Sequence, residues 1–258
     1  MLKAILASGG RRFMRRLALM AGAALVATAL VACGGGKGPA YEPAKADAAA
    51  HAALIGPADL PGSGWVITGR DQFQDGSRVD VASDSKACDS ARAKSELAKK
   101  TAAEDRAGRA QLVLEIPAST QAPLATTIEQ TVSVQNTTAA TAKAMDAFRD
   151  LMQSGDMGQC VADSVTRSFA GAPGAKVTSA PGSPAKAAPS NGTASAFDVV
   201  ITVQGQTLEM RLESYIWQDE NAGVTLSISG PKNAITPELV GRALEAAAAK
   251  LKAQRGDG

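Results

Sequence analysis

The chain has 258 residues, of which 45% are hydrophobic, 20% are charged and only 3% are aromatic, with one His and a formal net charge of +2. This composition excludes a fully disordered chain and a protein with several membrane spans. Five of the 27 basic residues and no acidic residue precede Cys33, so the remainder carries 22 basic against 25 acidic residues, a net charge of −3. An acidic, ring-poor body argues against nucleic-acid binding.

Residues 1–32 have the pattern of a bacterial signal peptide. A basic segment to Arg16 precedes an apolar run over 17–32, which is shorter than the roughly 20 residues of a spanning helix. The run ends in Leu30-Val31-Ala32-Cys33, which resembles the lipobox of bacterial lipoproteins. This resemblance implies cleavage between Ala32 and Cys33 and a diacylglyceryl (palmitate-type) anchor on Cys33, on the extracytoplasmic face of the cell membrane.

Two alternatives stay open for this leader. The first is an ordinary cleavage site with an incidental Cys33. The second concerns the route of export, because the pairs Arg11-Arg12 and Arg15-Arg16 are compatible with twin-arginine export as well as with general secretion.

Residues 33–50 are predicted to be the acylated Cys and a flexible tether, because Gly, Ala, Pro and Lys bury too little apolar surface to fold. Residues 51–254 are then a single α+β domain, long enough for one core. A Gly-, Pro-, Ser- and Ala-rich stretch over 171–195 interrupts it and is predicted to be a long loop with at most one ragged strand.

The first half of the domain predicts a helix over 88–106 and strands over 111–116 and 131–134. A second helix follows through Leu151, with Asn136-Thr137-Thr138 as its cap and Gly155 as its stop.

The second half alternates apolar and polar residues over 197–203, 208–216 and 224–228, which predicts an antiparallel meander with a turn at 204–206. Thr236 and Pro237 open a last helix. Its apolar stripe consists of Val240, Ala243, Leu244, Ala247 and Leu251. The expected fold is therefore an antiparallel β-sheet with helices packed on it.

Two cysteines remain after Cys33, namely Cys88 and Cys160. An even count in an exported protein favours one disulfide between them. Two buried free thiols, or a metal site with no His nearby, are the alternatives.

The segment Leu60-Pro61-Gly62-Ser63-Gly64-Trp65, the early Cys88, the late Cys160, the meander and the last helix together resemble the sensor-type extracellular domains of actinobacterial lipoproteins. The likeness extends to the extracytoplasmic domain of PknH-type mycobacterial kinases and, more distantly, to PsbP-like lipoproteins of the LpqN kind. It covers about 51–252. It implies an antiparallel sheet with packed helices, no enzymatic activity, and a role in ligand sensing or envelope interactions. The kinase domain has more disulfides than the one pair available here.

The sequence carries none of the common catalytic, nucleotide-binding or metal-binding motifs, so we expect no enzyme, no cofactor and no metal. His51 lies in an Ala-rich stretch where it is expected to lack an ordered partner. The acidic string that begins at Asp71 does not have the spacing of a calcium loop.

One strand face is the candidate ligand-binding surface. If Leu212 and Ile216 face one way, Arg211, Tyr215 and Trp217 face the other, where two rings beside charges suit a sugar or a lipid headgroup. Packing of these rings under a helix, with their polar tips in water, is the favoured interpretation of the same pattern. Trp65 is a further candidate, and for it too the favoured interpretation is structural, as an anchor of its loop.

The sequence therefore predicts a membrane-anchored extracytoplasmic lipoprotein that binds a lipid, a glycan or an envelope protein. Its alternative is a structural or adaptor lipoprotein that binds another exported protein and no small ligand. A cell-wall hydrolase using paired carboxylates such as Glu209 and Glu213 is the weakest hypothesis.

Overall fold

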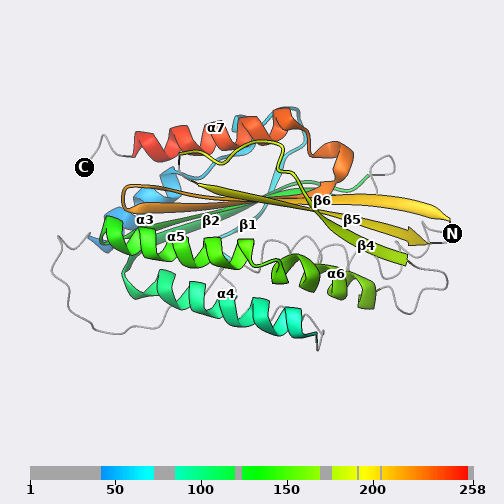
Figure 1. Cartoon of the computed structure of the whole chain (residues 1–258). Coiled ribbons are helices and arrows are strands. Elements are labelled where there is room, and N and C mark those ends of the chain that lie inside the picture. Colours follow the sequence, from blue (N-terminus) through cyan, green and yellow to red (C-terminus); the bar gives the residue numbers. More distant parts are fainter. Residues whose placement is uncertain are drawn as a thin grey trace.

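A seven-stranded antiparallel sheet forms the middle layer of the computed structural model, which describes residues 42–72, 85–119, 124–168, 176–190, 192–203 and 205–254 (Figure 1). The strand order is β1-β2-β3-β7-β6-β5-β4. The strands are β1 (Val66–Arg70), β2 (Arg106–Ile116), β3 (Thr126–Gln135), β4 (Lys176–Gly182), β5 (Thr193–Val203), β6 (Gln206–Asp219) and β7 (Ala222–Pro231). The fold is thus the α+β architecture that the sequence predicts.

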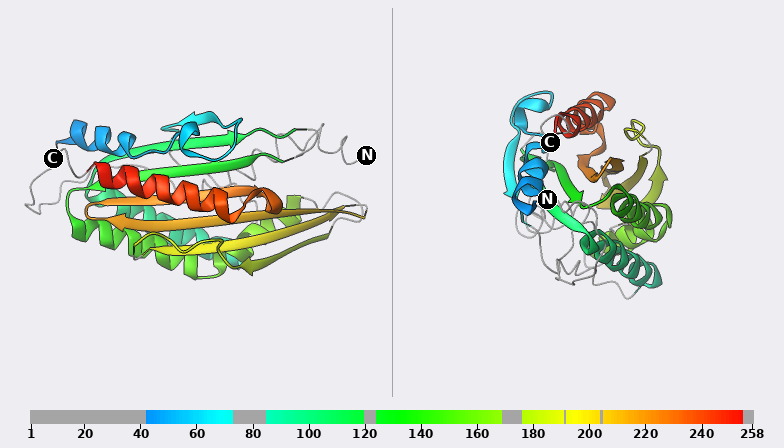
Figure 2. Two further views of the ribbon diagram at one scale, coloured as in Figure 1. Left: turned by 90° about the horizontal axis from the view of Figure 1, so that it is seen from above. Right: turned by 90° about the vertical axis from the view of Figure 1, so that its left-hand side faces the viewer.

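Helices cover both faces of this sheet (Figures 1 and 2). One face carries α4 (Lys86–Glu104), α5 (Thr138–Gln153) and α6 (Asp156–Ser168). The opposite face carries α3 (Pro43–Ala52) and α7 (Pro237–Ala253). Two short 3-10 turns, η2 (Pro57–Asp59) and η3 (Lys232–Ala234), complete the order of elements. We call the two sides the α4–α6 face and the α7 face.

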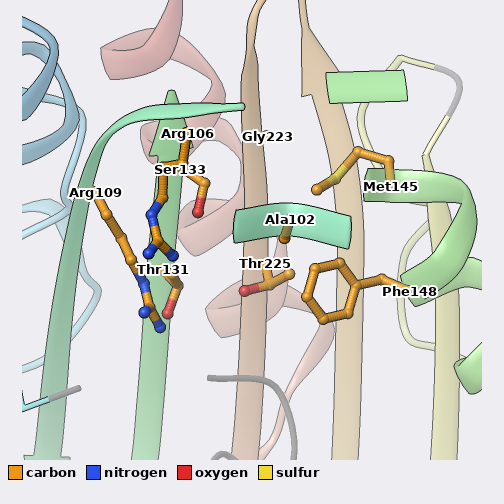
Figure 3. A pocket seen from close by; sticks show the side chains of 9 residues that line it. All are labelled: Ala102, Arg106, Arg109, Thr131, Ser133, Met145, Phe148, Gly223 and Thr225. Carbon is orange, nitrogen blue, oxygen red and sulfur yellow. The ribbon is translucent and has the colours of Figure 1, made fainter. Parts of the chain in front are cut away.

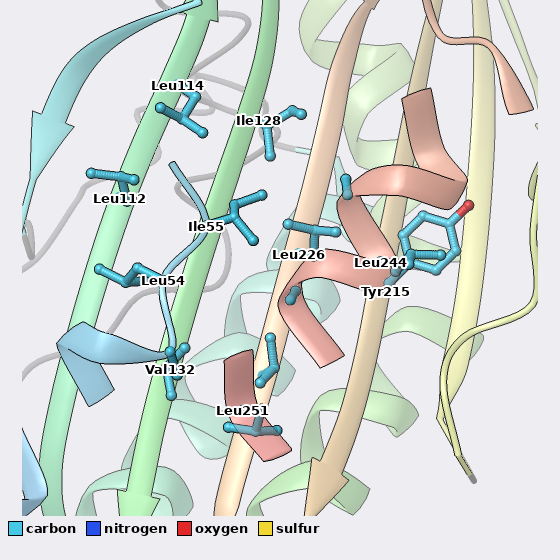
Figure 4. Close-up of a cluster of buried hydrophobic side chains, with 14 of the residues drawn as sticks. Leu54, Ile55, Leu112, Leu114, Ile128, Val132, Tyr215, Leu226, Leu244 and Leu251 are labelled. Atoms are coloured by element: carbon cyan, nitrogen blue, oxygen red, sulfur yellow. The ribbon is translucent and has the colours of Figure 1, made fainter. Parts of the chain in front are cut away.

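The main core lies on the α7 face (Figure 4). Alternate residues of the central strands, such as Ile128 and Val132 of β3 and Leu226 of β7, point to this side. The apolar stripe of α7, which the sequence predicts, packs onto these strand residues, and all of its members are buried. A smaller apolar cluster joins Met145 and Phe148 of α5 to α4 and to β6 on the other face.

The helix ends follow the predicted chemistry. The Thr137 hydroxyl accepts the backbone N–H of Ala140 at the start of α5, and the Thr236 hydroxyl accepts that of Leu239 at the start of α7. Gly155 follows α5 with φ of +73°, a conformation that favours glycine.

The expected tether over 33–50 is wrong for its last part. Pro43–Ala52 is the helix α3, which packs on β2, and Ala46 and Ala50 are completely buried. The chain after α3 is held by Gln130, whose amide donates to the carbonyl of Ala53 and accepts the N–H of Ile55. The domain therefore begins near residue 43, while 33–41 and the leader lie outside the described residues.

The stretch over 171–195 contains the expected ragged strand, β4, on one edge of the sheet. The segment 183–190 that follows β4 runs across β6 on the α7 face (Figure 1). Strand β1 and helix α6 are additions that the sequence pattern does not predict.

Cys88 of α4 and Cys160 of α6 form a disulfide, as expected from their even count. Within the described residues, no helix has both the length and the apolar character needed to cross a membrane. The same part of the chain holds no cluster of three or more His, Cys, Asp or Glu side chains suited to a metal ion.

Candidate functional site

The rings proposed from the sequence lie inside the α7 face. Tyr215 (Figure 4) is 0% and Trp217 is 2% exposed, and both belong to the main core. Trp65 is 7% exposed, and its indole N–H donates to the carbonyl of Pro61 at 3.1 Å. Packing, the favoured interpretation of these rings from the sequence, is therefore what the structure describes. Ligand binding by them stays a prediction.

Arg211, the remaining candidate on that strand, belongs to a buried polar network. Its Nε donates to the carboxylate of fully buried Glu213 at 2.6 Å, which also accepts the Tyr215 hydroxyl and the backbone N–H of Ala185. Burial and the Glu213 carboxylate raise the pKa of Tyr215 well above its usual value. These bonds fix the segment 183–190 to β6.

The opposite face of the sheet is polar in its central strands. The ladder aligns Arg109, Ser133 and Gly223 in a first row across β2, β3 and β7, and Gln111, Thr131 and Thr225 in a second. A third row holds Val113, Glu129, Ser227 and, from β6, Ser214, and a fourth holds Glu115, Thr127 and Ser229. A sheet covered by helices on both sides normally presents apolar residues on both faces, so this face is unusual.

A cleft opens where α4 and α5 meet the first two rows (Figure 3). Its enclosed part is only about 20 Å³, and the space in front of it, about 340 Å³ in all, includes open solvent. Its lining consists of Ala102, Arg106, Arg109, Thr131, Ser133, Met145, Phe148, Gly223 and Thr225. Two guanidinium groups and three hydroxyls thus face a thioether and an aromatic ring across one opening.

Glu129 continues the polar face beyond the cleft. Its carboxyl accepts the amide N–H of Gln111 at 2.6 Å, with both residues buried. Burial raises the pKa of Glu129 to about 7, even though the Gln111 hydrogen bond and the charge of Arg109 both lower it. A carboxyl of this kind holds its proton close to neutral pH.

Three buried polar atoms of this face have no hydrogen-bond partner within the described residues, namely Gln111 Oε1, Thr127 Oγ1 and Gln135 Oε1. Buried polar atoms are usually paired, because an unmade hydrogen bond costs about 1–3 kcal/mol. Gln111 Oε1 and Thr127 Oγ1 flank Glu129, whereas Gln135 lies at the other end of β3.

His51 has an ordered partner, contrary to the expectation from its sequence context. Its Nε2 lies 2.8 Å from Asp71 Oδ2, and Asp71 Oδ1 accepts the N–H of Gln111. The hydrogen bond to Asp71 raises the pKa of His51, and bonds from Gln111 and His51 outweigh desolvation to lower the pKa of Asp71. The pair ties α3 to the end of β1 and lies apart from the residues that line the cleft.

The sequence held one signal for the cleft. Thr127, Glu129, Thr131 and Ser133 occupy every second position of β3, and the positions between them are apolar except for Gln130. This pattern is typical of a strand with one face in water. In the structure β3 is a central strand, and α4 and α5 lie over the side that carries these four residues. The alternation therefore corresponds to polar residues beneath helices and not to a face in water. The strand order that gives the pattern this meaning is a property of the fold.

No protein-family profile matches the sequence, and no curated protein matches it. Among solved structures, the extracellular domain of PknH from Mycobacterium tuberculosis aligns at 13% identity with a TM-score of 0.41, over 82% of this chain and 97% of that chain. LpqN, involved in cell envelope biogenesis of Mycobacterium tuberculosis, aligns at 10% identity with a TM-score of 0.21, over 54% of this chain and 74% of that chain. Likenesses of this size assign neither an activity nor a ligand to this chain.

Proposed function

We propose that this chain is a lipid-anchored, extracytoplasmic protein of the bacterial envelope, and that its domain binds a ligand in the cleft between α4, α5 and the sheet without transforming it. The observation that carries the binding proposal is the cleft itself. Arg106, Arg109 and three hydroxyls lie opposite Met145 and Phe148, so one opening offers hydrogen-bond donors on one side and apolar surface on the other. This is the usual composition of small-molecule sites.

Binding without catalysis is supported by the lining. Among the described residues that line the cleft there is no carboxylate, imidazole, thiol or amine. Hydroxyls and guanidinium groups orient a ligand, and Glu129, the nearby carboxyl with a pKa of about 7, is not part of the lining and accepts a hydrogen bond from Gln111.

The binding test compares a cleft-filling variant with a matched control. Ser133→Leu places a larger apolar side chain in the cleft, and Thr178→Leu makes the similar change at an exposed site on edge strand β4. Residues 34–258 are exported in a related bacterium behind a leader that is cleaved without acylation, and the organic and aqueous extracts of the purified protein are analysed by mass spectrometry. We expect a stoichiometric compound from the parent protein and from Thr178→Leu, absent from Ser133→Leu.

Two results contradict the binding proposal. A compound retained in full by a folded Ser133→Leu protein places the site elsewhere. An empty parent protein favours the adaptor hypothesis, in which the domain binds another envelope protein.

Anchoring is supported by the sequence Leu30-Val31-Ala32-Cys33 and is tested separately. Mass spectrometry of the wild-type chain is expected to find a diacylglyceryl group on an N-terminal Cys33. The Cys33→Ala variant is expected to lack this group and, because cleavage follows acylation, to keep its leader. If the wild-type chain has no acyl group, or if Cys33→Ala is cleaved after Ala32 like the wild type, the anchor proposal is wrong.

A further inference from the structure

The polar surface on the α4–α6 face extends past the cleft along the strands. Thr131 and Thr225 line the cleft, and the next residues on the same side are Glu129 and Ser227, followed by Thr127 and Ser229. Each step of two residues advances about 7 Å along a strand. We call Gln111, Thr127, Glu129, Ser227 and Ser229 the polar floor. All five residues are buried and none of them lines the cleft, so a ligand that reaches them from the cleft has to displace the groups that cover them.

The polar floor is incompletely hydrogen-bonded. Gln111 uses its amide N–H on Glu129 at 2.6 Å, but in the part of the chain that the structure describes its Oε1 has no partner, and neither has Thr127 Oγ1. An apolar residue at position 127 would avoid this cost, since valine has nearly the shape of threonine without the hydroxyl. An unpaired acceptor and an unpaired hydroxyl on either side of Glu129 indicate a group that completes them.

We propose that the polar floor binds an uncharged polyhydroxylated group, such as a sugar ring, which extends into it from the cleft. This inference rests on the proposed function, because it names the ligand class of that site. A sugar hydroxyl both donates and accepts hydrogen bonds, so one such group donates to Gln111 Oε1 while another pairs with Thr127 Oγ1.

The composition of the floor argues against other ligands. Its members carry hydroxyl, amide and carboxyl groups and no cation, so an anion placed there meets Glu129 without a compensating charge in the floor. An alkyl chain would leave Gln111 Oε1 and Thr127 Oγ1 unpaired. Arg106 and Arg109 lie in the cleft, one or two rows away, so an anionic part of the same ligand would bind there.

The experiment uses residues 34–258, exported in the same way, and three probes, namely D-mannose, inorganic phosphate and octanoate. Binding is followed by changes in ¹H–¹⁵N chemical shifts during titration, with the side-chain amide of Gln111 as the local reporter. We expect D-mannose to shift the Gln111 amide signals saturably. Phosphate and octanoate are expected to leave these signals in place.

Thr127→Val separates a binding hydroxyl from a structural one. We expect its affinity for mannose to fall about tenfold, the effect of one lost hydrogen bond, while its unfolding midpoint stays equal or rises. The matched control is Thr207→Val, at an exposed position of β6, which should bind like the parent protein.

Each contrary outcome has a distinct meaning. If mannose gives no saturable shift, or if Thr127→Val binds mannose unchanged, the inference is overturned. A loss of stability in Thr127→Val with unchanged binding shows that the hydroxyl is structural, held by buried water. An extracted compound that Ser133→Leu abolishes but that carries no hydroxyl groups leaves the proposed function standing and refutes the polyol.

Discussion

Glu129 lies in the central strand β3, and its environment opposes ionisation. Burial raises its pKa to about 7, and the hydrogen bond from Gln111 and the charge of Arg109 recover only part of the lost hydration. In the unfolded chain the same carboxyl titrates near its ordinary value of about 4.5. The folded state therefore retains a proton that the unfolded state releases between these two pH values.

This difference predicts how stability depends on pH. The contribution of Glu129 is complete below about pH 4.5 and is lost as the pH rises to about 7, a change on the order of 3 kcal/mol. Glu129→Gln is neutral at every pH. We expect its stability relative to the wild type to increase by about that amount between pH 4 and pH 8, measured by chemical denaturation at intervals of one pH unit.

The control for this prediction is Glu115→Gln in β2. It removes a partly exposed carboxyl that lies on the same side of the sheet as Glu129. It should show the pH dependence of the wild type. Parallel stability curves for the wild type and Glu129→Gln would mean that Glu129 titrates normally in the folded protein.

At the scale of elements, the position of α3 depends on the absence of a side chain at Gly108. A Cβ atom there would lie 2.3 Å from the carbonyl carbon of Ala46 and 2.5 Å from the nitrogen of Asp47. The helix also caps the strand, since the Asp47 carboxylate accepts the N–H of Arg109 at 2.9 Å. The backbones of α3 and β2 therefore touch, which only small residues permit.

Gly108→Ala is expected to displace α3 from the sheet and to lower the free energy of unfolding by about 1–3 kcal/mol, the usual cost of forced overpacking. Hydrogen exchange should accelerate in Ala46–Ala53 and stay unchanged in α7. Gly56→Ala is the control, because its added Cβ would meet only the Asp59 carboxylate at 3.8 Å, an ordinary contact. Unchanged exchange in α3 of the Gly108→Ala protein would contradict the described docking.

The strength of the local apolar pattern decides which elements the sequence predicts. Strands β5, β6 and β7 and helices α5 and α7 have clear apolar periods and caps, and all five are confirmed. Helix α3 resembles a tether because its buried residues are alanines, which signal little hydrophobicity. Helix α6 begins directly after Gly155, where the pattern predicts an end.

For the whole molecule, the sequence predicts the fold class but places the candidate ligand surface on the other face of the sheet from the cleft. Tyr215 and Trp217 attract attention as large rings beside charges, yet α7 and the segment 183–190 cover them. The cleft depends on which strands are central and on how α4 and α5 lie over them. The local pattern of Thr and Ser indicates a polar strand face, but it does not predict which strands are central or which helices cover them.

The two ends of α4 are held to the rest of the molecule in different ways. Its C-terminal half joins the apolar cluster with α5 through Ala98 and Ala102. Its N-terminal half has a small apolar contact with α6 around Cys88, Ala91 and Cys160, together with the ion pair of Lys94 with Asp156 at 2.7 Å. The disulfide therefore carries much of the attachment at this end of the helical layer.

Loss of the disulfide is expected to destabilise the protein by about 4 kcal/mol, because a link between residues 72 apart restricts the unfolded chain strongly. The Cys88→Ser, Cys160→Ser double variant should unfold at lower denaturant concentration than the oxidised protein, and dithiothreitol should lower only the stability of the protein with the disulfide. Hydrogen exchange should accelerate first in the N-terminal half of α4, while Ala98 and Ala102 stay protected longer by α5. If both proteins unfold at the same midpoint, the packing of α4 on α5 and the Lys94–Asp156 pair are sufficient to hold the layer, and the disulfide adds no stability to the wall of the cleft.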